Sequence, residues 1–413
     1  MNSSATSRMP LRHGMDMAVS RRMAEPISRF FIADKASAEP DPARWQQLGE
    51  GLSEGDPLAD ALVDWMFEHG MGSARALFEQ ALNRGLASVQ SAPGPLRDFF
   101  EHVERAPEWL DRARLEKGVQ ASYLSGLTGL RVLRDFGLMA GYQAGAINQT
   151  LVMTGVLEKG AARRIAETTK WRMDCSVEHG MDRFNDGFKN TVRVRMIHAI
   201  VRRHVGAHPQ WDAQRWGLPI NQVDMQATYL GFSALYVLGQ RAMGTLLTAQ
   251  EAEDIMHLWR YVGWLMGVDD KWLCDSLQAG FVSIYQNLLS QAPPDESSQQ
   301  LGRALMDEPL MRHYPRWRWL RGQWDKQVHL SICSLCVGRQ GLRALGLPRW
   351  AVPWYPVLFA PLNFTWCALN RALPGGRERL IAQGRRAQLA QLAIMFGTDD
   401  PAIVAMGRVQ TPS

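Results

Sequence analysis

The stretch RVRMIHAIVRRH, residues 193–204, decides the class of fold. Its apolar side chains recur every three or four positions, which is the period of an amphipathic α-helix. On a helix over residues 191–205 the apolar stripe consists of Val194, Ile197, His198, Val201 and Val205. The same period runs through most of the chain, and the alternating patterns typical of β-strands are scarce. We therefore predict an all-α protein built as a single large helical domain.

The histidine of this stretch, His198, lies in the apolar face, and Arg195 and Arg202 flank that face at its edges. Three roles are open from this helix alone: a packed core residue, a metal ligand and a general base. The simplest is a core histidine that is hydrogen-bonded to a backbone carbonyl. A buried imidazole must satisfy its N–H group, but it need not bind a metal.

A second helix is predicted just upstream, in KGAARRIAETTKW, residues 159–171. The residues that share one of its faces are Arg164, Glu167, Thr168 and Trp171. They form either a surface ion pair beside a threonine or the polar wall of a pocket. The segment between the two helices is rich in Gly, Asn and Asp, so the helices can turn back on each other. The polar face would then lie opposite His198.

Such a pairing suits haem. A haem iron takes a fixed imidazole on one side, and polar groups on the other side decide what happens to O₂. Arg195 and Arg202 would hold the haem propionates through charge-assisted hydrogen bonds. In the uncharged run 136–157 a glycine recurs at every fourth position, namely Gly137, Gly141 and Gly145. On one buried helix, this glycine face would let a flat macrocycle or another helix approach the backbone closely.

A second uncharged run, residues 350–370, contains three prolines, so a straight membrane helix is not expected. Its Trp and Tyr residues suit an interfacial patch, which leaves two interpretations: peripheral membrane contact and ordinary buried packing. Cys333 and Cys336 form a CxxC pair. We find no further ligands at zinc spacing and no βαβ pattern, so two buried thiols on a helix are favoured.

The composition and net charge limit the classes of partner that the protein is expected to bind. The 413 residues are 46% hydrophobic and 21% charged, with a net charge of +5 and a pI of about 9.0. The arginines are spread along the chain, and no concentrated basic face indicates nucleic-acid binding. The basic N-terminus has no apolar region typical of a secretory signal, so we expect a cytoplasmic protein. The oligomeric state cannot be predicted from these features.

Other common catalytic motifs are missing from the sequence. We find no HExxH, no paired ExxH of a di-iron bundle, no phosphate-binding glycine loop and no GxSxG elbow. These absences argue against a non-haem iron site, a nucleotide site and a serine hydrolase.

Several segments together resemble the latex clearing protein and MpaB-like oxygenase family. They are GLMAGYQAGAINQTLVMTG (137–155), RRIAET (163–168), RVRMIHAIVR (193–202), GLPINQVDMQATYLGFSALYVLGQRAMG (217–244), HLWRYVGWLMGV (257–268) and ALNRALPGGRERL (368–380). The likeness covers roughly residues 110–390 in the family's own order. Its most specific part is Arg–x–x–x–Thr followed by RxxHAxxR.

The resemblance implies a globin-like helical core with one b-type haem, and O₂-dependent cleavage of an olefinic, often isoprenoid, substrate. By position, His198 would be the proximal iron ligand, with Arg164 and Thr168 on the distal side. The expected organisation of the chain is a poorly ordered N-terminal tail (1–40), a helical extension (41–110), a haem-binding oxygenase-like domain (111–390) over the range of the likeness, and a C-terminal tail (391–413).

One position departs from the family pattern. Where rubber-cleaving members carry a lysine that can cap the iron, this chain has Glu167. The glutamate would act instead as a base or a hydrogen-bond relay, and Lys170 would reach toward the cofactor. Rubber-cleaving members are also secreted, so a smaller lipid or isoprenoid substrate is expected here. Two alternatives remain open: a non-catalytic haem protein that senses or carries O₂, and a helical interaction protein without a cofactor.

Overall fold

The computed structural model describes residues 9–34, 36, 38–155 and 160–397, and within these ranges it contains helices and no β-strand. The prediction of an all-α protein is confirmed. The elements in chain order are α1 (Met17–Phe31), α2 (Pro42–Gly51), α3 (Pro57–His69), α4 (Met71–Arg84), η1 (Leu86–Ser88), α5 (Gly94–Glu104), α6 (Arg112–Tyr123), α7 (Gly126–Val132), η2 (Leu133–Met139), α8 (Gly145–Met153), α10 (Ala161–Cys175), α11 (Asp186–Gly206), α12 (Ala213–Trp216), α13 (Gln222–Phe232), α14 (Ala234–Ala242), α15 (Ala249–Leu265), η3 (Asp270–Trp272), α16 (Leu277–Leu289), α17 (Glu296–Asp307), η4 (Glu308–Met311), α18 (Arg318–Ala344), α19 (Trp354–Ala372) and α20 (Gly376–Phe396).

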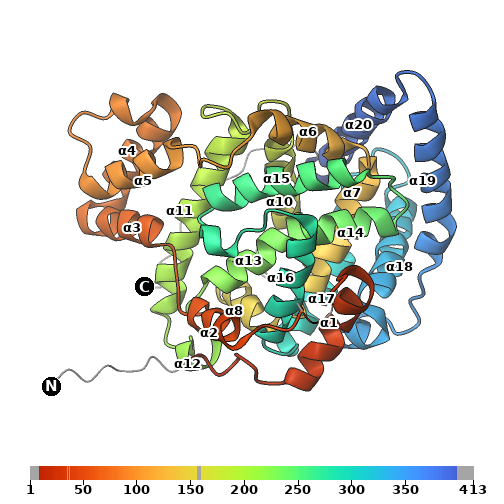
Figure 1. The fold of residues 1–413 in the computed structure, drawn as a ribbon, viewed down its shortest axis with the longest axis horizontal. Helices are drawn as coiled ribbons and strands as arrows, with labels where there is room; N and C mark the ends of the chain where they lie inside the picture. The colour runs from red at the N-terminus through yellow and green to blue at the C-terminus, as the bar shows by residue number, and fades with distance from the viewer. Residues whose placement is uncertain (1–8, 35, 37, 156–159, 398–413) are drawn as a thin grey trace.

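A helical lobe formed by α3, α4 and α5 lies on one side of the molecule, and α11 runs between this lobe and the remaining helices (Figure 1). The lobe has its own aromatic centre, in which Phe78, Phe99 and Phe100 are fully buried. Their ring centroids lie 5.4 to 6.2 Å apart. This lobe belongs to the region 41–110 that the sequence predicts as a helical extension.

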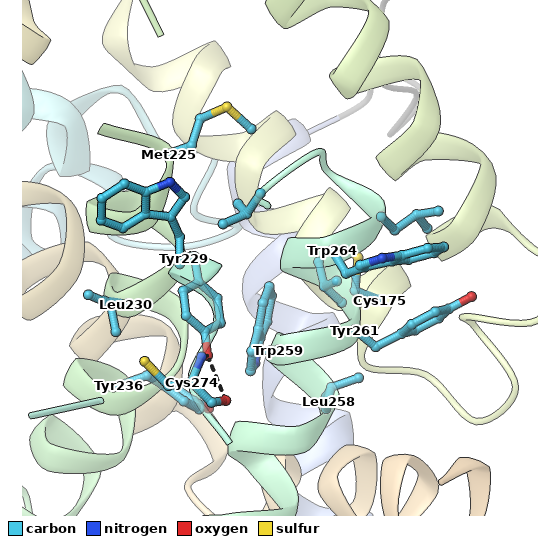
Figure 2. Close-up of a cluster of buried hydrophobic side chains, with 14 of the residues drawn as sticks. Cys175, Met225, Tyr229, Leu230, Tyr236, Leu258, Trp259, Tyr261, Trp264 and Cys274 are labelled. Carbon is cyan, nitrogen blue, oxygen red and sulfur yellow. Dashed lines mark hydrogen bonds between the residues drawn. The ribbon is translucent and has the colours of Figure 1, made fainter. Parts of the chain in front are cut away.

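The main core is built around α15, which packs on α6 and touches α11, α13, α14 and α16. Figure 2 shows how Trp259 of α15 lies beside Tyr229 of α13. The Tyr229 hydroxyl accepts a hydrogen bond from the backbone N–H of Cys274 at 3.2 Å, so its polar end is satisfied inside the core. Tyr261 and Trp264 stack with their ring centroids 5.9 Å apart. Large aromatic side chains therefore fix the helices around α15.

The N-terminal prediction needs a correction. Within 1–40, which the sequence predicts as a poorly ordered tail, residues 17–31 form α1. This helix packs on α16, with Phe31 and Phe281 ring centroids 5.5 Å apart. Ala24 and Ile27 are buried against the core, and this tertiary packing stabilises the helix. The polar composition of the segment gives no sign of that packing. The predicted C-terminal tail also begins later, because α20 continues to Phe396; residues 1–8 and 398–413 lie outside the described residues.

Both uncharged runs form helices in the structure, and the first is not one continuous helix. The first is divided into η2, wound as a π-helix, and α8, with a turn between them; residues 156–159 lie outside the described part. The second forms α19, which contains Pro361. Over the described residues, no helix combines the length and the apolar character that crossing a membrane requires.

Candidate haem and oxygen site

The helix that carries His198, α11, packs directly on α10. The connection between them reverses the chain, as the Gly- and Asn-rich segment predicts, and hydrogen bonds at its base fasten the two helices together. The indole N–H of Trp171 donates to the Thr191 hydroxyl at 3.0 Å, and that hydroxyl donates to the backbone carbonyl of Gly187 at 2.7 Å. The two helices predicted to face each other are therefore neighbours.

His198 is surrounded by protein, and its Nδ1 is buried without a hydrogen-bond partner among the described residues. His198 as a whole is nevertheless partly exposed to solvent, and this exposure comes from atoms other than Nδ1. Burial, with the charges of Arg202 and Arg164, lowers the pKa of His198 to about 4, so the imidazole is neutral at pH 7. The interpretation as a core histidine bonded to a backbone carbonyl is wrong, because no such bond is present for this described residue.

Arg164 of α10 lies close enough to His198 for its charge to act on the imidazole. Its Nη1 is buried and has no partner among the residues that the structure describes. Thr168, one turn further along α10, is half-buried. An unpaired guanidinium nitrogen inside a protein is costly, so a ligand that accepts its hydrogen bond would be favoured here.

The two other charged residues predicted on this side have partners elsewhere. The Glu167 carboxylate accepts from Arg163 Nε at 2.8 Å, and the guanidinium of Arg163 also covers the ring of Phe396. The Lys170 ammonium donates to Asp174 at 2.5 Å, within the same helix. Both side chains are thus engaged in intrahelical ion pairs, which weakens the predicted roles of Glu167 as a relay and of Lys170 as a cofactor contact.

The arginines that flank His198 are also occupied. Arg195 makes a two-pronged ion pair with Asp56, at 2.6 and 2.9 Å, and both side chains are 4% exposed. Arg202 pairs with Asp60 and donates to the Ile220 carbonyl at 3.1 Å. The guanidinium groups of Arg195 and Arg202 are thus bound to carboxylates of α3 and of its N-cap. This geometry argues against their predicted role as propionate ligands.

The predicted glycine face does not form. The π-turn of η2 and the turn before α8 change the helical phase, so residues four apart in this run no longer share one face. A methyl group on Gly145 would lie 2.5 Å from the Pro293 carbonyl oxygen, so this glycine serves close packing within the protein. Gly141 is exposed, and a methyl group there would meet nothing within 4 Å. Of the two, Gly141 alone faces open space.

Sequence reasoning missed the aromatic residues beside Trp171. The ring of Trp171 lies edge-on to Phe232 at 5.3 Å and to Trp259 at 5.8 Å, and the last two rings stack at 4.9 Å. These residues come from α10, α13 and α15, so the only sequence signal was the presence of aromatics in apolar helices. They give the α10–α11 region an apolar, water-excluding wall.

A second buried polar cluster was also missed. Its centre is Asp135 in η2, whose carboxylate contacts Arg134 at 2.7 Å and His329 Nδ1 at 2.6 Å. Burial raises the pKa of Asp135 to about 6 although Arg134 opposes the shift. Glu308 and Arg312 extend the network through a pair of 2.8 Å hydrogen bonds. A π-helix that carries a charged pair often marks a functional segment.

The residues around His198 fit a haem. A neutral imidazole can donate a lone pair to iron, and a haem needs one such protein ligand when the macrocycle supplies the others. The unpartnered Arg164 nitrogen would offer a hydrogen-bond donor beside such a group. Among the described residues, no three His, Cys, Asp or Glu side chains gather around one point as ligands of a bare metal ion.

The fold is all-α over the described residues, and comparison with known proteins identifies the family of the chain. Residues 130–361 match the family described as ER-bound oxygenase mpaB/B'/Rubber oxygenase, catalytic domain. The match spans more than half of the chain, so the chain belongs to this family and is an enzyme, an oxygenase. The matched range contains both α10 and α11.

Two relatives agree with this assignment. The chain is 27% identical over 297 residues to a rubber oxygenase of Streptomyces sp. (strain K30), covering 67% of this chain and 70% of the relative. The solved structure of latex clearing protein LCP in the closed state superposes with a TM-score of 0.57 at 21% identity, covering 82% of this chain and 91% of that structure. The structural likeness extends the shared fold beyond the matched range.

Proposed function

We propose that this oxygenase depends on haem b and uses O₂ to cleave or oxygenate a hydrophobic olefin of the isoprenoid or lipid class. The observation that carries the proposal is His198: a neutral imidazole inside the protein, with an unpartnered Nδ1, on the helix next to an unpartnered Arg164 nitrogen. Family membership favours this over a non-catalytic haem carrier, because the family is one of oxygenases.

In this proposal each residue has a distinct task. Haem b, when bound, supplies the iron at which O₂ is activated. His198 holds the iron from α11, and its low pKa keeps the imidazole unprotonated and available. Arg164 offers a charged hydrogen-bond donor to the oxygen species, and Thr168 offers a hydroxyl group one turn away. Trp171, with the rings packed beside it, keeps water away from an apolar substrate.

The first experiment tests the cofactor. The purified protein, expressed with a haem supply, should contain about one haem per chain and show a Soret band. His198→Ala should lose the haem or shift the band strongly. His204→Ala is the matched control, because His204 lies on the same helix but is exposed. An unchanged spectrum in His198→Ala would remove the proposed iron ligand.

The second experiment tests the oxygen side. Arg164→Gln and Thr168→Ala should keep the haem content while O₂ consumption with an olefin falls by roughly 10² or more, as for other donors that stabilise developing charge. Glu167→Gln is the comparison, because Glu167 is paired with Arg163 and should matter much less. Equal activity in the Arg164 variant and wild type would exclude the proposed donor.

The third experiment addresses the substrate. Polyisoprene, squalene and a prenylated lipid would be supplied separately, and carbonyl-containing cleavage products would be identified by mass spectrometry. We expect oxygenated products from at least one of the smaller olefins. Products from polyisoprene alone would show that the smaller substrates are wrong, while the haem assignment would stand on the spectra.

A further inference from the structure

Exposed large apolar side chains are concentrated on one part of the surface. Of the 22 large hydrophobic residues that are exposed in the described part of the chain, 14 lie between positions 317 and 373. Most come from the start of α18, from the loop before α19 and from α19 itself; the two others are Leu335, later in α18, and Leu373, just beyond α19. Scattered exposed leucines need no explanation, but a concentration of this size marks an interaction surface.

The α19 helix contributes one continuous face. Its exposed apolar positions follow the helical repeat and include Val357, Leu358, Leu362, Leu369 and, just beyond the helix, Leu373, each at least 55% exposed. The opposite face holds α19 to the protein: Cys367 is buried, and the Asn363 amide donates to the Met243 carbonyl at 3.0 Å. In Figure 1, α19 runs along the outer rim, on the side away from the α3–α5 lobe.

The start of α18 adds tryptophans to this face. Trp317 and Trp319 are 74% and 70% exposed, and Trp324 packs edge-on against Trp354 at the beginning of α19 with ring centroids 5.4 Å apart. The two segments therefore meet. Trp317 also adopts a left-handed backbone conformation, with φ of 55°, which is unfavourable for a bulky residue. The chain accepts this strain while leaving the ring in solvent, where it gains no packing.

Within residues 309–377, the segment that forms this apolar surface, every exposed charged side chain is an arginine. Between Glu308 and Glu378 the only acidic residue is Asp325, which is buried and ion-paired with Arg312 at 3.1 Å. The exposed arginines in the same stretch are Arg316, Arg318, Arg321, Arg339, Arg343 and Arg349. Within the described residues, none of these six arginines makes an ion pair with a carboxylate. Exposed tryptophan and leucine beside unpaired arginine and no exposed carboxylate is the chemistry of a surface that meets anionic lipid headgroups.

We propose that the apolar face formed by α19 and the start of α18 is a docking surface for an anionic phospholipid bilayer. The helix lies in the interface plane, with Leu358 and Leu362 in the acyl boundary and the arginines at the phosphate level. The contact runs along the bilayer surface, because the opposite face of α19 is packed on the protein. The inference goes beyond the oxygenase proposal and does not depend on it, because it concerns where the protein sits rather than what it converts.

Binding to lipid vesicles tests the surface without using turnover. The full chain would be floated with vesicles of phosphatidylcholine alone and of phosphatidylcholine with phosphatidylglycerol. We expect binding to the anionic vesicles that is at least tenfold stronger than to the neutral ones and that weakens as salt is added. Equal or negligible binding to both kinds of vesicle would overturn the proposal.

Variants then locate the contact. Arg316→Gln with Arg318→Gln should weaken binding to the anionic vesicles on the order of 20-fold, since each basic residue near such a surface contributes about a fivefold factor. Leu358→Ser with Leu362→Ser should reduce binding to both kinds of vesicle. The matched control is Leu389→Ser, on an exposed apolar residue of α20 that lies outside this surface. Equal losses in the control and in the Leu358 and Leu362 variant would contradict the proposed location.

A second copy of the chain is the competing occupant. Light scattering of the wild-type protein and of the Leu358→Ser, Leu362→Ser variant decides between the two. A monomer in both cases agrees with a lipid-docking surface. A wild-type dimer that becomes monomeric in the variant would overturn the proposal, because the face would then be an interface between copies. All substituted side chains are exposed, and circular dichroism checks that the helices are retained.

Discussion

Three aspartates of the N-terminal lobe and three arginines of α11 offer a graded test of what holds the lobe to the His198 helix. Asp56, Asp60 and Asp64 repeat every four residues at and along α3 and pair with Arg195, Arg202 and Arg203, respectively. The pairs pass from the interior to the surface. Asp56 and Arg195 are each 4% exposed, whereas Arg203 and Asp64 are 47% and 55% exposed.

We predict a steep difference between the two ends of this series. Asp56→Asn should lower the free energy of unfolding by about 3–5 kcal/mol, because it leaves the Arg195 guanidinium buried without its counter-charge. Asparagine keeps the helix cap, since the Asp56 side chain accepts from the Ala59 N–H at 3.3 Å and an amide oxygen can do the same. Asp64→Asn should cost less than about 1 kcal/mol, as for other exposed pairs.

The assay is urea unfolding, followed by circular dichroism and by tryptophan fluorescence and compared at equal m-value. A double variant, Asp56→Asn with Arg195→Met, should be less destabilised than the sum of the single variants, because the orphan charge is removed. The reasoning fails if Asp56→Asn and Asp64→Asn shift the midpoint equally, since burial would then not control the strength of the pair.

Three further outcomes follow from the same contacts and from the cysteines. Burial raises the pKa of Asp56, but the charges of Arg195 and Arg202 outweigh burial and lower this pKa below 3.8. The loss of stability in Asp56→Asn should therefore be complete above pH 3.8 and should disappear as the pH falls through the lowered pKa. Urea titrations at several pH values measure this, and a loss that persists at lower pH would contradict it. Gly267→Ala should destabilise by more than about 1 kcal/mol, because its backbone has φ of +95° and a methyl group would lie 2.2 Å from Asp56 Oδ2; wild-type thermal stability in this variant would refute the close contact. Cys333 and Cys336 are free thiols whose pKa values are raised by burial and by the Asp135 charge, so neither should be alkylated by iodoacetamide at pH 7 until the protein unfolds, as read by mass spectrometry; rapid labelling of the native protein would show that the pair is reactive.

The all-α class of the fold could be predicted from the sequence, and so could the contact between the two helices that carry the candidate site. Helical period is a local property, so the all-α class and the helices that became α10 and α11 follow from residue spacing alone. The position of His198 on an apolar stripe predicted that it is enclosed by protein. The Gly- and Asn-rich segment between the two helices predicted that Arg164 comes near His198, and its charge does act on the imidazole.

The sequence could not assign partners to charged groups. Asp56 and Arg195 lie 139 residues apart in the sequence, and the residues around each of them do not indicate that they form an ion pair. The arginines beside His198 looked available to a cofactor because their carboxylates are supplied by the lobe, and the lobe reaches them only through tertiary packing. Glu167 and Lys170 have partners one turn away on their own helix, Arg163 and Asp174, which the sequence prediction did not assign to them.

Tertiary structure also decided two questions of helical phase and exposure. The glycine repeat of residues 136–157 predicts one face only if the helix is continuous, and the π-winding of η2 removes that condition. The run 350–370 could equally have been buried. It is exposed because only one side of α19 packs on the protein, and no described element covers the opposite side. By itself the sequence determined which segments become helices, because that depends on neighbours along the chain; only the packed structure decided which charges are paired and which apolar faces remain open, because those depend on residues that the chain brings together from far apart.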